Sequence, residues 1–178
     1  RRARVILQNR ATKKAISPEA IESLKSLYEG RNADHRLRAM WSLHVTQNMT
    51  EQDLINALSD KDEYVRAWAI QMLCEDMNAS KTVLTKLAAM SQSDGSAVVR
   101  LYLAAALQRV PDDSKWNITE GLIGQNDDVD DHNIPKMIWF AMEGLVQQNP
   151  GKGMAMAATS AIPMIAEFSA RRLVDADE

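Results

Sequence analysis

Apolar residues recur every three or four positions along most of the chain, and short polar stretches interrupt them at intervals. The first clear stripe holds Ile21, Leu24 and Tyr28, and it follows Ser17-Pro18. Serine favours the residue just before a helix, and proline is tolerated in the first turn. A spacing of three and four places these apolar side chains on one helical face. The pattern therefore predicts an amphipathic helix that begins near residue 18.

A second helical pattern follows this one after a short polar turn. Pairs of helices joined by a polar turn then recur several times along the sequence. A single pair cannot bury both its faces, but stacking on the next pair does so. The sequence predicts an all-α protein, made of one repeat domain over residues 1–178. The first residue, Arg1, falls inside a helical pattern, so we expect the domain to be part of a longer chain. The expected repeats are 17–48, 49–78, 79–110, 111–149 and 150–178, with 1–16 as the end of a preceding repeat.

A basic residue opens each expected second helix and gives a measure of the period. These residues are Arg38, Arg66, Arg100 and Lys136, at intervals of 28, 34 and 36 positions. Periods of about 30–45 residues with two helices each are typical of α-solenoids. The uneven intervals indicate turns of variable length between helices of constant length.

Each copy also carries an aromatic residue two or three positions after its basic one. The four aromatic residues are Trp41, Trp68, Tyr102 and Trp139. Large side chains at equivalent positions of stacked units fill the space between layers. We expect them to form a ladder along one edge of the stack.

The repeated arginines need a partner, because the positive end of the helix dipole disfavours a cation in the first turn. An arginine fork can bind a carboxylate at two points. An acidic residue in the neighbouring turn would supply that carboxylate. An alternative is that the arginines line a groove for an anionic ligand. The expected acidic partners of Arg38, Arg66 and Arg100 are Asp34, Asp62 and Asp94.

The stretch from Asp62 to Leu73 reads D-x-x-V-R-A-x-A-x-x-x-L, and it resembles the second helix of a HEAT repeat. The best copy is 50–78. The fourth copy departs from the pattern, with Pro135-Lys136 in place of Val-Arg and a long acidic insertion. The resemblance implies an α-solenoid of about five stacked antiparallel helix pairs, wound as a right-handed superhelix. It also implies that the second helices form a concave face that binds protein segments or neighbouring domains.

Three longer stretches carry a finer resemblance. "HRLRAMWSLHVT", "LSDKDEYVRAWAIQMLCED" and "VVRLYLAAALQRVP" are similar to the helical-repeat segment of large secreted bacterial proteins. In that family a β-propeller resembling sugar dehydrogenases precedes the repeats, and a c-type cytochrome domain follows them. The resemblance implies a spacer between two redox domains, in the periplasm or at the cell surface. The segment itself has no C-x-x-C-H haem attachment motif.

Composition and charge narrow the choice of partner. The chain is 46% hydrophobic and 25% charged, which is ordinary for a soluble protein. Its formal charge of −3 gives no electrostatic case for nucleic acid binding. No apolar run approaches the roughly 20 residues of a membrane span. Cys74 is the only cysteine, so an internal disulfide and a cysteine zinc cluster are excluded. We therefore expect a protein partner, or neighbouring domains of the same chain.

The sequence predicts no catalytic or cofactor-binding residues. It contains no phosphate loop, dinucleotide fingerprint or nucleophile elbow, and its three histidines lack metal-ligand spacing. The one site-like feature is the loop 126–133, where Asp127, Asp128, Asp130 and Asp131 could offer oxygen ligands to calcium. The EF-hand pattern fails there, because the sixth position is not glycine and no glutamate closes the loop. A solvated acidic turn is the favoured interpretation.

The leading functional hypothesis is a non-catalytic scaffold for protein–protein or interdomain packing. One alternative is an enzyme on a HEAT-like scaffold, of the DNA glycosylase or bilin lyase type. Another is a stand-alone adaptor that binds a peptide in its groove. A DNA glycosylase needs a strongly basic face, which the net charge of −3 disfavours.

Overall fold

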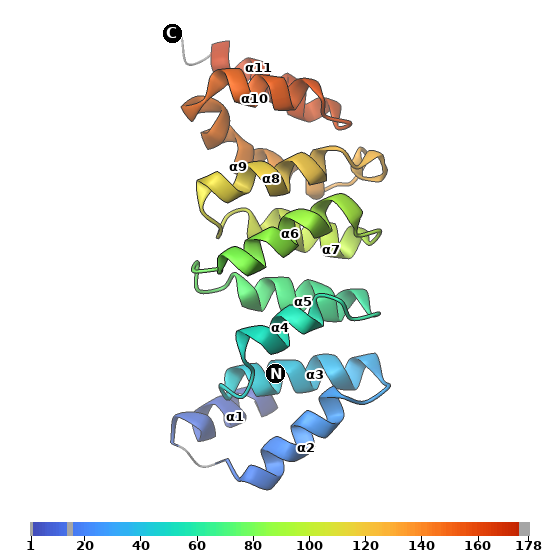
Figure 1. Ribbon diagram of the computed structural model, residues 1–178, viewed down its shortest axis with the longest axis vertical. Helices are drawn as coiled ribbons and strands as arrows, with labels where there is room; N and C mark the ends of the chain where they lie inside the picture. Colours follow the sequence, from blue (N-terminus) through green and yellow to red (C-terminus); the bar gives the residue numbers. More distant parts are fainter. Residues whose placement is uncertain (1, 14–15, 175–178) are drawn as a thin grey trace. The chain divides into compact units, whose positions relative to one another are not determined.

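A computed structural model describes residues 2–13 and 16–174, and the regular structure of these residues is entirely helical (Figure 1). The all-α prediction is confirmed. Each expected repeat contains two helices, and the stretch before residue 17 contains one. The helices are α1 (Arg2–Thr12), α2 (Pro18–Tyr28), α3 (Ala33–Val45), α4 (Glu51–Ala57), α5 (Glu63–Leu73), α6 (Lys81–Ser93), α7 (Ala97–Ala106), α8 (Asp112–Ile123), the 3-10 turn η1 (Asn126–Asp128), α9 (Ile134–Gln148), α10 (Pro150–Ala158) and α11 (Pro163–Val174).

The chain divides into two compact units, Arg1–Met72 and Leu73–Glu178. The first unit holds α1 to α4 and nearly all of α5, and the second holds α6 to α11. Antiparallel helix pairs build both units, as expected for an α-solenoid. A single domain over residues 1–178 and a right-handed superhelix stay predictions.

In the first unit, α3 lies at the centre, with both α1 and α2 packed against it. Ser17 caps α2 as predicted, because its side chain accepts a hydrogen bond from the backbone N–H of Ala20. Thr50 and Asp53 form a capping box that starts α4, with the Thr50 backbone N–H donating to Asp53 Oδ2 at 2.8 Å. Local signals thus fix where these helices begin.

The backbone conformation at the end of α3 is not predicted by the local sequence. Gln47 adopts φ +58°, in the left-handed region that favours glycine. Its N–H donates to the His44 carbonyl at 2.9 Å, and the Asn48 N–H donates to the Leu43 carbonyl at 2.8 Å. These two bonds form a Schellman motif, which reverses the chain toward α4.

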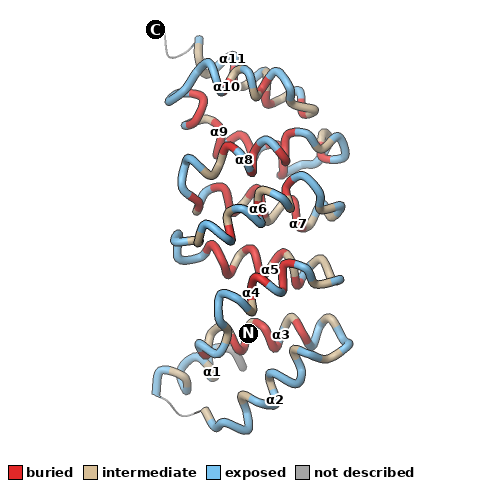
Figure 2. Tube along the Cα trace, in the orientation of Figure 1, coloured by how far each residue is buried: buried red, intermediate tan, exposed pale blue. Residues whose placement is uncertain are grey.

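In the second unit the first helices form one layer and the second helices form another. Helix α6 packs on α8, while α9 lies between α7 and α11. Figure 2 marks buried residues along the helices of this unit. The largest of them in this unit that are almost fully buried are Leu87, Leu103, Leu107, Ile118, Leu122, Ile123, Ile134, Ile138 and Met142.

The α6–α8 contact depends on a glycine. A Cβ atom added at Gly121 of α8 would lie 2.8 Å from the Ser91 backbone carbon of α6, and nearer still to the Ser91 hydroxyl. Gly144 of α9 has no atom within 4 Å of such a Cβ atom. Close packing of the first helices therefore requires glycine at position 121 and leaves position 144 free.

Candidate functional site

Three arginines occupy the same position, the fourth residue of a second helix. They are Arg36 in α3, Arg66 in α5 and Arg100 in α7, at intervals of 30 and 34 positions. The prediction that Arg38 belongs to this set is wrong. Arg38 is exposed, whereas Arg36 is buried. Two residues turn a helix by about 200°, so only one arginine of the R-x-R sequence can face the neighbouring repeat.

Each of these arginines binds the turn that precedes its own helix. Its Nη1 atom donates a hydrogen bond to the backbone carbonyl six residues earlier. The distances are 3.3 Å for Arg36, 2.9 Å for Arg66 and 3.1 Å for Arg100. This constant offset shows that the turn before each second helix presents a carbonyl oxygen to the same guanidinium position.

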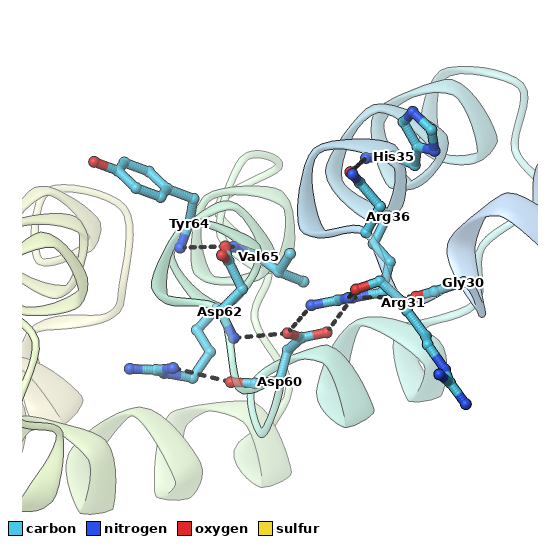
Figure 3. A network of polar contacts seen from close by, with 10 residues as sticks. Gly30, Arg31, His35, Arg36, Asp60, Asp62, Tyr64 and Val65 are labelled. Carbon is cyan, nitrogen blue, oxygen red and sulfur yellow. Dashed lines mark hydrogen bonds and ion pairs between the residues drawn. The ribbon is translucent and has the colours of Figure 1, made fainter.

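In the first unit, Arg36 also reaches the following repeat (Figure 3). Its Nε donates to Asp60 Oδ2 at 3.0 Å and its Nη2 donates to Asp60 Oδ1 at 2.7 Å. Asp60 lies in the turn before α5, and its Oδ1 accepts a further bond from the Asp62 N–H at 2.8 Å. The guanidinium thereby joins the turn before α3 to the turn before α5.

The second unit contains an equivalent arginine–aspartate pair that is more deeply buried. Arg100 Nε donates to Asp128 Oδ2 at 2.6 Å, and Arg100 Nη2 donates to Asp128 Oδ1 at 2.7 Å. The side chains are 3% and 1% exposed. Asp128 belongs to η1, in the turn that leads to α9. We call Arg36–Asp60 and Arg100–Asp128 the inter-repeat clamps.

The clamps correct the predicted pairing. The carboxylates that bind Arg36 and Arg100 at two points come from the next repeat, at Asp60 and Asp128. The acids predicted as partners, Asp34, Asp62 and Asp94, do not supply these two-point contacts to Arg36 and Arg100.

Asp34 is exposed in the first turn of α3, and Asp62 accepts bonds from the N–H groups of Tyr64 and Val65 at 3.0 and 3.2 Å. Asp94 offers its backbone carbonyl to Arg100. Asp62 is thus occupied by backbone N–H groups, whereas Asp60 and Asp128 bind the arginine of the preceding repeat.

Charge states follow from these contacts. Burial alone would raise the pKa of Asp60, but hydrogen bonds from Arg36 and from the Asp62 N–H outweigh it and lower that pKa. The hydrogen bond to Asp60 raises the pKa of Arg36, and the hydrogen bond to Asp128 raises the pKa of Arg100. Both arginines therefore stay cationic over the whole physiological range.

The acidic loop divides its carboxylates among separate tasks. Asp128 binds Arg100, while Asp131 accepts bonds from the N–H groups of Asn133 and Ile134, each at 2.8 Å. These backbone bonds lower the pKa of Asp131. Asp127 and Asp130 are exposed. Within residues 2–13 and 16–174, no three His, Cys, Asp or Glu side chains gather in a way that could hold a metal ion.

Each clamp links one repeat to the next within its unit, and the comparison with known families agrees with that organisation. A family model described as HEAT repeats matches residues 11–108, more than half of the chain. The chain belongs to the HEAT-repeat family. No curated protein and no solved structure matches it significantly. HEAT repeats in general are structural scaffolds that mediate protein interactions.

The fourth copy of this HEAT-repeat chain departs from the arginine pattern, as its sequence indicates. Lys136 is the third residue of α9 and is exposed, and the fourth residue is Met137. The prediction that places Lys136 in register with the arginines is therefore wrong. Pro135 takes one of the first two helical positions, which changes how the helix starts. Any role of Arg38 or Lys136 in binding a partner stays a prediction.

The predicted aromatic residues make edge-to-face pairs in both units. Trp41 of α3 and Trp68 of α5 have ring centroids 4.8 Å apart at 76°. Trp139 of α9 and Phe168 of α11 are 5.6 Å apart at 80°. Sequence reasoning missed Phe168, although it is the sixth residue of its helix, as Trp139 is. A continuous ladder through Tyr102 stays a prediction.

The Trp139–Phe168 pair borders a shallow hollow of about 240 Å³ between α9 and α11. Arg172 Nε lies 3.2 Å from Glu143 Oε1 across this hollow, and Arg171 lies 6.0 Å from the Phe168 ring centroid. The hollow combines aromatic rings with arginines that already have acidic partners, since Arg171 also pairs with Glu167.

In the described part of this HEAT-repeat chain no helix is long and apolar enough to cross a membrane.

Proposed function

We propose that this HEAT-repeat chain is a non-catalytic scaffold for protein–protein or interdomain packing. We further propose that it spaces two redox domains of a larger secreted bacterial protein, in the periplasm or at the cell surface. Family membership supports the scaffold. The likeness of its Trp41 and Trp68 contexts to the repeat segment of propeller–cytochrome proteins supports the spacer.

One observation carries the scaffold proposal. Among the described residues, the buried charged side chains are Arg36, Arg100 and Asp128. All three belong to the inter-repeat clamps. Burying a charge costs several kcal/mol unless it is paired and hydrogen-bonded. Here that cost serves to hold consecutive repeats in register, which suits a protein whose task is to keep parts at a fixed spacing.

The complete reading frame tests the spacer proposal. We expect it to encode a β-propeller upstream of residue 1 and a C-x-x-C-H motif downstream of residue 178. A free-standing gene whose start codon immediately precedes residue 1 would contradict the spacer. That result would leave the scaffold proposal in place.

Cross-linking of the full-length protein tests the scaffold proposal. Lys136 is exposed on α9, a second helix, and Lys86 is exposed on α6, a first helix. Because second helices form the docking face of such arrays, we expect Lys136 to cross-link to a flanking domain or partner more often than Lys86. Equal cross-linking of the two lysines, or none from Lys136, would contradict the scaffold proposal.

A further inference from the structure

A groove lies between α6 and α8, the first helices of two consecutive helix pairs in the second unit. The two helices run in the same direction (Figure 1), and toward their C-terminal ends they touch, where Gly121 meets Ser91. The groove occupies their N-terminal parts, within residues 81–88 of α6 and 113–117 of α8. Its volume is about 290 Å³. Ligand pockets start at about 300 Å³, so the groove suits a small molecule.

The α8 wall of the groove offers three hydrogen-bond acceptors. Asp113, Ser114 and Asn117 line it, at spacings of one and three along the helix. Within the described part of the chain, their side chains form no hydrogen bond or ion pair, whereas the neighbouring Asp112 binds Lys115 at 2.7 Å. A carboxylate, a hydroxyl oxygen and an amide oxygen can together accept the three N–H bonds of an ammonium group.

The α6 wall carries a cation that its own helix does not favour. Lys81 is the first residue of α6, and no acidic residue occupies the first turn of this helix. The helix dipole disfavours a cation there. Lys81 forms no ion pair with any residue that the structure describes. Nothing among these residues therefore offsets the cost of its position, whereas a carboxylate bound at Lys81 would.

The rest of the α6 wall adds an apolar strip. Leu84 and Ala88 line the groove and are half-buried, and they follow Lys81 at spacings of three and four, which places all three on one helical face. Thr85 also lines the groove, but its hydroxyl already donates to the Lys81 carbonyl at 2.9 Å. One wall thus combines a cation with apolar surface, and the other combines an anion with neutral acceptors. Because Lys81 and Asp113 form no ion pair with each other, a ligand has to bridge them.

We propose that this groove binds a small zwitterion whose carboxylate and ammonium groups are separated by an aliphatic chain. The carboxylate pairs with Lys81, the aliphatic chain packs on Leu84 and Ala88, and the ammonium group binds Asp113 and its neighbouring acceptors on α8. A simple anion meets repulsion from Asp113 and a simple cation meets repulsion from Lys81, so a zwitterion fits better than either. The site belongs to the first helices and does not depend on the docking face expected of the second helices.

Titration with 6-aminohexanoate tests this proposal on the 178-residue chain. In nitrogen–proton NMR spectra, amide signals from the first two turns of α6 and α8 should shift. Hexanoate and hexylamine each lack one charged group and should bind at least about tenfold more weakly, because each loses one charge-assisted contact. Glycine, whose two charges are adjacent, should also bind more weakly. Added salt should weaken the binding of 6-aminohexanoate.

A charge exchange locates the site. Lys81→Glu and Asp113→Lys should each weaken the binding of 6-aminohexanoate at least about tenfold. The double variant Lys81→Glu/Asp113→Lys should restore binding, because a zwitterion can lie in the reverse direction once the two charges are exchanged. The matched control, Lys86→Glu/Glu120→Lys, makes the same exchange on the same two helices outside the groove. All four positions are exposed, so circular dichroism should show that every variant is folded.

Four outcomes would overturn the proposal. They are no shift of these signals at millimolar 6-aminohexanoate, equal binding of hexanoate or hexylamine, no recovery in the double variant, and equal weakening by the control exchange. Each of these results concerns the first helices alone. The scaffold function, which is tested by cross-linking of Lys136, would stand unchanged.

Discussion

Arg100 and Asp128 are taken almost entirely out of water, and each satisfies the other at two points. A buried pair of this kind adds little to stability compared with apolar residues, but removing one partner leaves a charge with no compensation. The clamp thus acts on register more than on total stability. Its counterpart at Arg36 is less enclosed, since the Asp60 side chain is 17% exposed.

Removing one half of the buried clamp should be costly. We expect Asp128→Ala to lower the free energy of unfolding by about 3–5 kcal/mol, because Arg100 is then buried without a counterion. Glu167→Ala, which breaks the exposed Arg171 pair, should cost less than about 0.5 kcal/mol. Urea denaturation measures both. The double change Arg100→Met/Asp128→Leu should cost less than Asp128→Ala, and the opposite order would contradict this account.

The Asp60 clamp should make stability depend on acid. The folded-state pKa of Asp60 is lowered, so its contribution is present above the unfolded value of about 3.9 and is lost as pH falls through the folded pKa. We expect Asp60→Asn to reduce stability at pH 7 and to matter progressively less below about pH 4. Thermal unfolding from neutral pH to acid measures this. A variant that is equally weakened at all pH values would show that the charge of Asp60 has no part in it.

At the scale of the helix, the sequence predicts where helices begin better than it predicts where they end or which helices pack together. Ser17, Thr50 and Ser80 cap their helices through side-chain bonds that local sequence predicts. The turn that ends α3 uses Gln47 at a position that favours glycine, so no local signal marks it. No local signal marks the close contact of α8 with α6 at Gly121 either, because that contact depends on which residue of α6 lies opposite the glycine.

Two glycine substitutions separate helix propensity from packing. Gly144→Ala should stabilise the protein by about 0.5–1 kcal/mol, because alanine favours the helix and position 144 is open. Gly121→Ala should destabilise it by about 1–3 kcal/mol, because the new methyl group meets the Ser91 backbone. Urea titrations of both variants should give changes of opposite sign. A stabilising Gly121→Ala would mean that α6 and α8 can move apart freely.

At the scale of the whole molecule, the period of the hydrophobic pattern was enough to predict an all-α repeat protein. The register of the basic residues was not, because Arg36 and Arg38 both sit beside suitable neighbours in sequence. In the structure Arg36 is buried and binds Asp60 of the next repeat, while Arg38 is exposed. The clamp acids were equally hidden, since Asp60 and Asp128 lie 24 and 28 residues beyond their arginines. Long-range pairing of this kind leaves no local pattern.

In an array held by neighbour contacts, damage should stay local. We expect Asp128→Ala to increase amide hydrogen exchange in α7 and α9, the helices next to the broken clamp, and to leave α2 and α3 unchanged. Exchange followed by mass spectrometry gives this comparison on one sample. A uniform increase over all four helices would indicate that the two units unfold as one.

The lone thiol offers a consequence of its own. Cys74 follows α5, is fully buried, and has its pKa raised by burial to about 11. Thiolate, the form that attacks disulfide reagents, is therefore scarce and shielded at neutral pH. A reagent can modify Cys74 only when the structure around it opens. The rate of thiol labelling therefore measures how often that opening occurs, and no cysteine has to be introduced.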